Sequence, residues 1–216
     1  PDGIMGIKEL AAQKLDPYRG ESSRIISAIN KINESLTASW WDTRSTLGSK
    51  HGHKVFSREK DAVQKLEEAV EKDNLSPEAQ STALEVIADL VGADRRFAVD
   101  ALDLSLETPT LNPKRQKKVA KLQEDAQQQI DEGDNHRDQI QAPNDEDDED
   151  EDDEGYWSKA IDHYRKAWEN AIAALDEQAD PTGGIDDDDD DDEEEDEDDG
   201  NGNGNGNGNG NGNDDE

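Results

Sequence analysis

The sequence predicts an all-α protein: a bundle or short solenoid of five to six amphipathic helices with a disordered acidic tail. Three observations support this prediction. Apolar residues recur at helical spacing over much of the chain. Ser, Asn and Pro stand where helices would begin. No alternating apolar stretch and no Asn-Gly turn between apolar runs predicts a strand, so we expect no sheet. The expected organisation is one helical domain over residues 1–180 and a tail over residues 181–216.

The first two helices are short. One is expected from Ile4 to Leu15, ended by Asp16-Pro17, because proline disfavours helical backbone in the residue before it. A second is expected to begin near Glu21-Ser22. Its apolar face would carry Ile25, Ile29, Ile32 and Leu36.

Two longer helices are expected next. Ser57 is predicted to be the N-cap of one, with Val55 or Phe56 packing against its first turn. Ser76-Pro77-Glu78 predicts the start of the other, which could reach Leu106. Gly92 in its middle costs roughly 1 kcal/mol relative to Ala and is compatible with a kink. The inward faces are expected to be Ala62, Val63, Leu66, Ala69 and Val70, then Leu84, Ile87, Leu90 or Val91, Phe97, Ala101 and Leu104.

The last two helices flank an acidic insert at residues 144–155. Asn112-Pro113 predicts the start of the first, and Gly133 is predicted to end it as a C-cap residue. The second is expected from about Gly155 to Leu175. Small residues between large aromatics favour close packing of this helix on a partner. The apolar positions are Val119, Leu122, Ala126 and Ile130 in the first, and Ala160, Tyr164, Ala167 and Trp168 in the second.

Charge is concentrated in a few segments. The chain has 216 residues and a formal charge of −34. Residues 145–154, 186–199 and 214–216 hold 27 of the 57 acids and no Lys or Arg, so the remainder, with a net charge of −7, has a foldable composition. The acidity argues against nucleic-acid binding, because like charges repel phosphates. The runs should bind cations loosely.

Cysteine is absent, which excludes disulfides, thiol nucleophiles and Cys-zinc sites. No apolar run is long enough for a membrane-spanning segment. The chain begins at Pro1 rather than Met, so we expect a processed or excised piece of a longer protein.

Few residues suggest a metal site. His51 and His53 could be a metal pair, but zinc needs three or four ligands, and an exposed or structural loop is favoured. The segment containing Asp199, Asn201, Asn203 and Gly204 resembles the start of an EF-hand loop, but its twelfth position is Gly210 rather than Glu. Pairs of Asp or Glu on the helices are not evidence for a glycosidase, because acidic residues occur throughout the chain. We therefore assign no catalytic, cofactor-binding or metal residue and expect no cofactor.

Aromatic residues are the remaining candidates for a binding surface. A helix-packing core is the favoured interpretation, and a groove that binds sugar or peptide is the alternative. These residues are Trp40, Trp41, Tyr156, Trp157, Tyr164 and Trp168. Asn33 and Asn74 begin glycosylation sequons, of which Asn33 is the better candidate because Pro77 follows the other.

Two resemblances follow from these motifs. Gly-Tyr-Trp-x-x-Ala-Ile-x-x-Tyr-x-x-Ala-Trp at 155–168 resembles the second helix of a tetratricopeptide repeat, although no second copy exists. The order of features over residues 20–178 resembles a helical accessory region of large secreted and surface proteins of archaea. Its pieces are Ser35-Leu36 with Trp40-Trp41, residues 52–56, Ala93-Asp94-Arg95, residues 130–134 and residues 159–168.

These resemblances imply a non-enzymatic helical structural or interaction module of a halophilic archaeal surface or secreted protein. Its partner would be an unknown protein or an upstream domain of the same chain, and its location extracellular or at the cell surface, with cytoplasmic as the alternative. The acidic insert favours a halophilic protein. The count of 14 Lys against 9 Arg weakens this interpretation, because an extreme halophile is expected to use fewer lysines. The other interpretations are a tetratricopeptide-like peptide-binding adaptor and a fragment of an enzyme.

Overall fold

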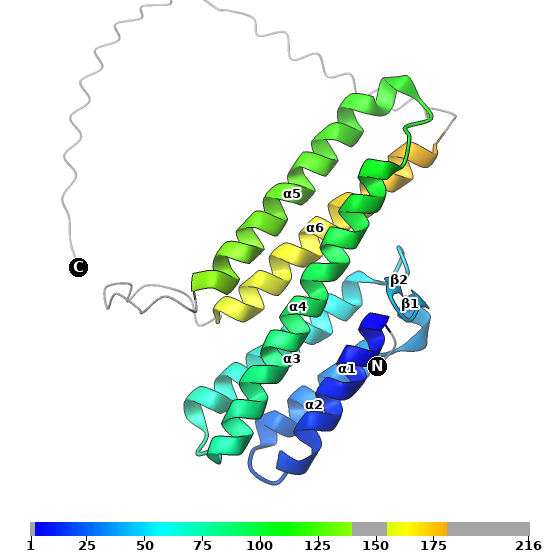
Figure 1. The fold of residues 1–216 in the computed structure, drawn as a ribbon. Helices are drawn as coiled ribbons and strands as arrows, with labels where there is room; N and C mark the ends of the chain where they lie inside the picture. The colour runs from blue at the N-terminus through cyan, green and yellow to red at the C-terminus, as the bar shows by residue number, and fades with distance from the viewer. Residues whose placement is uncertain (1–2, 140–154, 181–216) are drawn as a thin grey trace, which may run out of the picture. The chain divides into compact units, whose positions relative to one another are not determined.

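The computed structural model describes residues 3–139 and 155–180, and helices account for 82% of these residues. The all-α class is therefore confirmed (Figure 1). Within these two ranges the α-helices are α1 (Gly3–Leu15), α2 (Ser23–Ser35), α3 (His53–Lys72), α4 (Pro77–Glu107), α5 (Gln116–Gln139) and α6 (Tyr156–Ala179). The 3₁₀ helices η1 (Asp16–Tyr18), η2 (Ala38–Trp40) and η3 (Pro113–Arg115) lie between them. The acidic insert and the tail lie outside the described residues.

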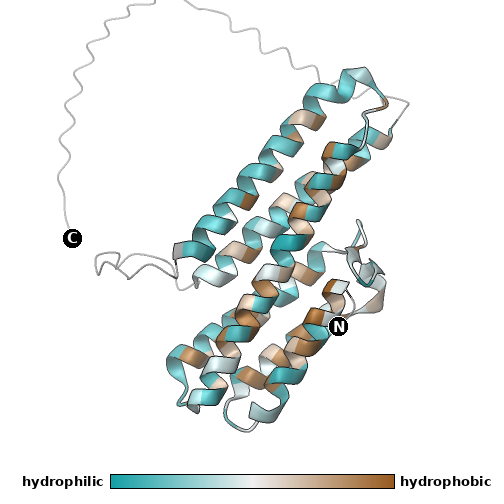
Figure 2. Ribbon diagram, in the orientation of Figure 1, coloured by the Kyte–Doolittle hydropathy of each residue, from teal (hydrophilic) through white to brown (hydrophobic). Residues whose placement is uncertain are grey.

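Helix α4 connects two groups of helices. It contacts α1 and α3 along one part of its length, and α5 and α6 along another (Figure 1). Helix α2 packs along α3, and α5 packs along α6. One continuous hydrophobic core joins residues of all six helices. Figure 2 shows the hydrophobic residues gathered on α1 and α4, whereas α5 is mostly hydrophilic.

Three predicted helix starts have the expected capping bonds. The hydroxyl of Ser22 accepts a bond from the Arg24 amide at 3.0 Å, and that of Ser76 accepts one from Ala79 at 3.2 Å. The Asn112 side chain accepts one from the Lys114 amide at 3.1 Å, although it begins η3 rather than an α-helix. Such bonds satisfy amides that have no partner within the helix.

The predicted start of α3 is wrong. The helix begins at His53, and Ser57 lies inside it, where its hydroxyl donates to the carbonyl of His53 at 3.1 Å. Gly52 precedes the helix and lies against Trp168, since a Cβ at Gly52 would stand 2.6 Å from the indole. Long-range packing with α6, rather than a local cap, accompanies this start.

The expected inward face of α4 is partly wrong. Leu84 and Leu104 are 45% and 53% exposed, while the neighbouring Ala83 and Ser105 are fully buried. The core stripe is displaced by one residue at these positions, because α4 has to face different helices along its length. The helix runs without interruption through Gly92.

Two further expectations fail. Gly133 does not end α5, which continues to Gln139. The expected absence of a sheet is also wrong, because β1 (Trp41–Thr43) pairs antiparallel with β2 (Thr46–Leu47). The Thr43 and Thr46 hydroxyls hydrogen-bond to each other at 2.7 Å, and the carbonyl of Arg44 accepts a bond from the Met5 amide at 2.9 Å.

Candidate functional site

Three charged side chains meet in the interior, one from each of three helices. Lys8 of α1 donates hydrogen bonds to Glu59 of α3 and to Asp94 of α4, the latter at 2.9 Å between Nζ and Oδ1. All three side chains are 0% exposed. We call Lys8, Glu59 and Asp94 the buried triad. It is the most concentrated set of chemically capable groups in the described core.

Aromatic rings enclose the buried triad. The Lys8 ammonium lies 4.8 Å from the ring centroid of Phe97 and 5.7 Å from that of Trp41. Trp41 and Phe97 meet edge to face at 5.5 Å, and Phe56 packs on Phe97 at 6.1 Å. The Trp41 indole donates to the carbonyl of Ser35 at 2.9 Å, which fixes its orientation. The triad therefore lies in apolar surroundings, where electrostatic interactions are strong.

Burial decides the protonation of the triad. Desolvation raises the pKa of Asp94 well above its usual range, and the charge of Glu59 raises it further. Desolvation opposes the charge of Lys8, but the attraction of Asp94 and Glu59 outweighs it and raises the pKa of Lys8. Both shifts favour a triad in which Lys8 keeps its charge and Asp94 holds its proton more tightly than an exposed aspartate does. As two carboxylates, the acids would leave Glu59 Oε1 and Asp94 Oδ2 without a hydrogen-bond partner among the described groups, so a retained proton fits the geometry.

Sequence reasoning missed the triad, although a signal was present. Each member is a single charge within an apolar helical stripe: Lys8 between Ile4 and Ala11, Glu59 between Phe56 and Val63, and Asp94 between Leu90 and Phe97. A charge at such a position is rarely tolerated unless it is paired. The sequence did not show the pairing, because Lys8 is 51 residues from Glu59 and 86 from Asp94.

A second polar network joins α4, α5 and α6. Arg95 donates two bonds to the Asp134 carboxylate, at 2.7 and 2.8 Å, and the Tyr164 hydroxyl donates to the same carboxylate at 2.7 Å. Desolvation works against ionisation of Asp134, but the bonds from Arg95 and Tyr164 prevail and lower its pKa. Burial raises the pKa of Tyr164. Tyr164 therefore packs and hydrogen-bonds at once.

At His51 and His53 the sequence favoured a structural or exposed loop and left a metal pair as the alternative. Within residues 3–139 and 155–180, no group of three His, Cys, Asp or Glu side chains could hold an ion. His51 and His53 are both half-buried near the start of α3. The two histidines distant in sequence, His136 and His163, instead stack on each other with centroids 5.1 Å apart. The EF-hand-like segment containing Asp199, Asn201, Asn203, Gly204 and Gly210, and all three acidic runs, lie outside the described residues.

The aromatic candidates divide by burial. Trp41, Tyr164 and Trp168 are buried in the core. The ring centroids of Trp168 and Phe56 lie 5.8 Å apart. Trp40 and Trp157 are half-buried and pack against the core, and Tyr156 is half-buried. Packing is therefore the role of the three buried residues. Of the sequon residues, Asn33 and Asn74 are both exposed, so glycosylation of Asn33 stays a prediction.

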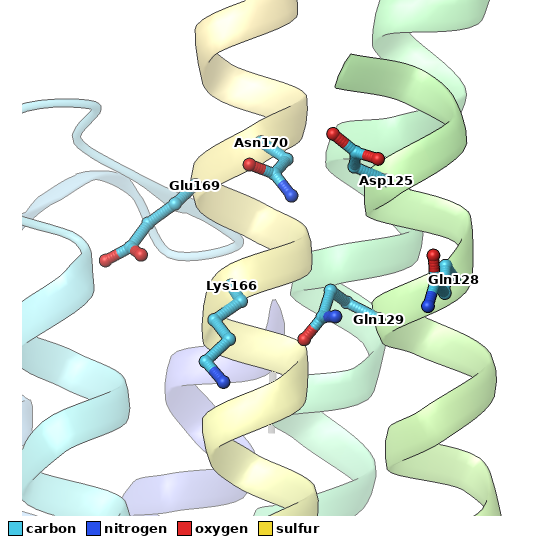
Figure 3. Close-up of a pocket in the computed structure, with 6 residues that line it drawn as sticks. All are labelled: Asp125, Gln128, Gln129, Lys166, Glu169 and Asn170. Carbon is cyan, nitrogen blue, oxygen red and sulfur yellow. The ribbon is translucent and has the colours of Figure 1, made fainter. Parts of the chain in front are cut away.

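Two surface hollows are polar or mixed in character. One, about 310 Å³, lies between α5 and α6 (Figure 3) and is lined by Asp125, Gln128, Gln129, Lys166, Glu169 and Asn170. The other, about 420 Å³, lies between α1 and α2 and includes Glu9, Arg19, Ile29 and Leu36. Neither is lined by an aromatic residue.

The described helices include none long and apolar enough to cross a membrane. No protein-family profile, curated protein or solved structure matched the chain.

Proposed function

We propose that this chain is a non-enzymatic helical module that serves as a structural or interaction unit of a halophilic archaeal surface or secreted protein. Its partner would be a neighbouring domain of the same chain or another protein. The observation that carries the structural role is the enclosure of the buried triad. Lys8, Glu59 and Asp94 have no exposed side-chain surface, so their contacts tie α1, α3 and α4 together rather than meet a substrate.

The outer ion pairs support the same role. Lys60 of α3 pairs with Asp162 of α6 at 2.5 Å. Lys14 of α1 pairs with Asp89 of α4 at 2.7 Å. These exposed or half-exposed pairs each contribute little to stability, about 0–1 kcal/mol, but they favour one pairing of helices over others.

Native-state hydrogen exchange tests the structural role. If the triad only joins helices, amides of α1, α3 and α4 around Lys8, Glu59 and Asp94 should exchange through global unfolding. An active site would have to open to admit a substrate. Exchange of these segments through an opening far easier than global unfolding would contradict the proposal and favour the enzyme-fragment interpretation.

Salt dependence tests the halophilic part. Raising KCl from about 0.1 M to about 1 M shortens the Debye length from about 10 Å to about 3 Å. Repulsion among the acidic segments should weaken, so the melting temperature of the full chain should rise. The matched control is a chain ending at Asp180, which lacks the run at 186–199 and should gain less. A melting temperature that falls steadily with salt would contradict halophily.

A peptide-binding adaptor is the second candidate, because the hollow in Figure 3 lies between α5 and α6, the pair that includes the tetratricopeptide-like motif. The polar lining, including Gln129 and Asn170, fits the backbone of an extended peptide. Peptides selected on the wild-type chain should lose binding when Gln129 and Asn170 are both changed to Ala. If the selected peptides bind the double variant as tightly as the wild type, the hollow is not a peptide-binding site.

A further inference from the structure

We propose that Lys8 and Asp94 join in an intramolecular amide bond, with Glu59 as the group that moves the protons. The product would be an isopeptide cross-link between α1 and α4. This goes beyond the proposed structural role, because it adds a covalent modification at a defined pair of side chains.

The reacting groups are already in place. Nζ of Lys8 lies 2.9 Å from Oδ1 of Asp94, and the same nitrogen donates to Glu59. The packed core therefore holds the amine and the carboxyl side by side, which removes much of the entropic barrier that two separate molecules would face. An Asp94 side chain that keeps its proton is a carboxylic acid, which amines attack more readily than a carboxylate.

The step balances without any co-reactant. The Lys8 ammonium first passes a proton to the Glu59 carboxylate, which leaves a neutral amine, and the amine nitrogen attacks Cγ of Asp94. The Cγ–OH bond breaks, and the hydroxyl leaves as water with the proton that Glu59 returns. The second proton of the amine passes to Glu59. One N–C bond forms, one C–O bond breaks, one water is released, and Glu59 ends protonated.

The surroundings favour the product. Ammonium and carboxylate are costly in an apolar interior, whereas the amide and the protonated Glu59 carry no charge. The rings of Trp41 and Phe97 lie over the Lys8 nitrogen and keep water from the bond. Removal of bulk water opposes the reverse reaction, hydrolysis.

The same helices provide a matched comparison. Lys14 of α1 contacts Asp89 of α4 at 2.7 Å, close to the Lys8–Asp94 separation. Their side chains, however, are 24% and 36% exposed. Here water stabilises the separated charges, so no amide should form. Burial, rather than distance, distinguishes the two pairs.

Intact mass under denaturing conditions tests the proposal on the wild-type chain. The expected mass is one water below that of the sequence. Trypsin does not cleave after an acylated lysine, so digestion should yield residues 1–14 joined to residues 73–95. A full sequence mass, or a loss that maps elsewhere in the chain, overturns the proposal. Since the wild type decides the matter, the test does not require any variant to fold.

Two substitutions add controls. Lys8→Arg should restore the full sequence mass, because the guanidinium is not a nucleophile at this pH. Lys14→Arg should keep the loss of one water. Persistence of the loss in Lys8→Arg, or its disappearance in Lys14→Arg, would contradict the assignment of the bond to Lys8.

Discussion

Gly133 of α5 lies directly against the ring of Tyr164 of α6: a Cβ built on Gly133 would stand 2.5 Å from Cε1 of the tyrosine. Tyr164 is fully buried, and its hydroxyl reaches Asp134, the residue after the glycine. The absence of a side chain at Gly133 lets the two helices approach closely enough for both contacts.

The first prediction follows from this contact. Gly133→Ala should lower the free energy of unfolding by about 1–3 kcal/mol, because the added methyl overlaps a ring that the core holds in place. Chemical denaturation measures the change. Gly92→Ala is the matched control: Gly92 is exposed in the middle of α4, and a Cβ there meets nothing within 4 Å.

Gly92→Ala should have the opposite sign. Alanine favours a helix interior over glycine by about 1 kcal/mol, so this variant should be more stable than the wild type. If both alanine variants stabilise the chain, Gly133 does not lie against the ring of Tyr164.

Trp168→Ala tests how α6 is held. Trp168 is 4% exposed, lies against Gly52 and packs on Phe56. Its removal leaves a large cavity and should cost about 3–5 kcal/mol in the free energy of unfolding. Denaturant melts in high salt measure this. An unchanged midpoint would mean that Trp168 serves a ligand rather than the core.

Glu67 makes stability depend on pH. Its Oε1 accepts a bond from the Trp157 amide at the start of α6, at 3.2 Å, and burial raises its pKa from 4.5 to about 7. The folded chain therefore holds this proton more tightly than the unfolded chain. The stabilisation of the folded state by the Glu67 proton is complete below pH 4.5 and is lost as the pH rises to about 7.

Glu67→Gln should remove that dependence. Between pH 4.5 and about 7, the wild type should lose about 1–3 kcal/mol relative to the glutamine variant, after allowing for the partial exposure of Glu67. Parallel unfolding titrations of the two proteins isolate this group from Asp94 and Asp134, which titrate in both. Stability curves that stay parallel over this interval would refute the assigned burial.

The tail should be dispensable for folding. Residues 182–216 contain no large apolar side chain except Ile185, so they have nothing to dock into a core. At about 1 M KCl, where salt screens the charge of the tail, truncation after Pro181 should keep the melting temperature within about 2 °C, less than the shift expected from 1 kcal/mol in a domain of this size. A larger fall would show that the tail packs.

Local signals account for what the sequence predicted. Apolar periodicity places the helices, and Ser22 and Ser76 begin α2 and α4, because a cap needs only groups within one turn. The final helix was likewise predictable from its own stripe of small and aromatic residues. Each of these features depends on neighbours a few positions away, which the sequence shows directly.

Other features depend on partners far along the chain. Gly133 carries the local signature of a helix end, yet α5 continues, because Tyr164 of another helix requires a glycine there. Ser57 has the chemistry of an N-cap, but packing at Gly52 and Trp168 accompanies an earlier start of α3. A capping propensity of about 1 kcal/mol yields to burial of a large aromatic, which contributes more.

The sequence by itself determined the helical class, most helix starts and the separation of the acidic runs from the apolar segments. The tertiary structure alone decided which charges are buried together. Lys8, Glu59 and Asp94 each read as an isolated charge on an apolar face, and only the packing of α1, α3 and α4 makes them one cluster. The physical reason is that the energy of a buried charge depends on its distance from other charges and from water, which the order of residues does not contain.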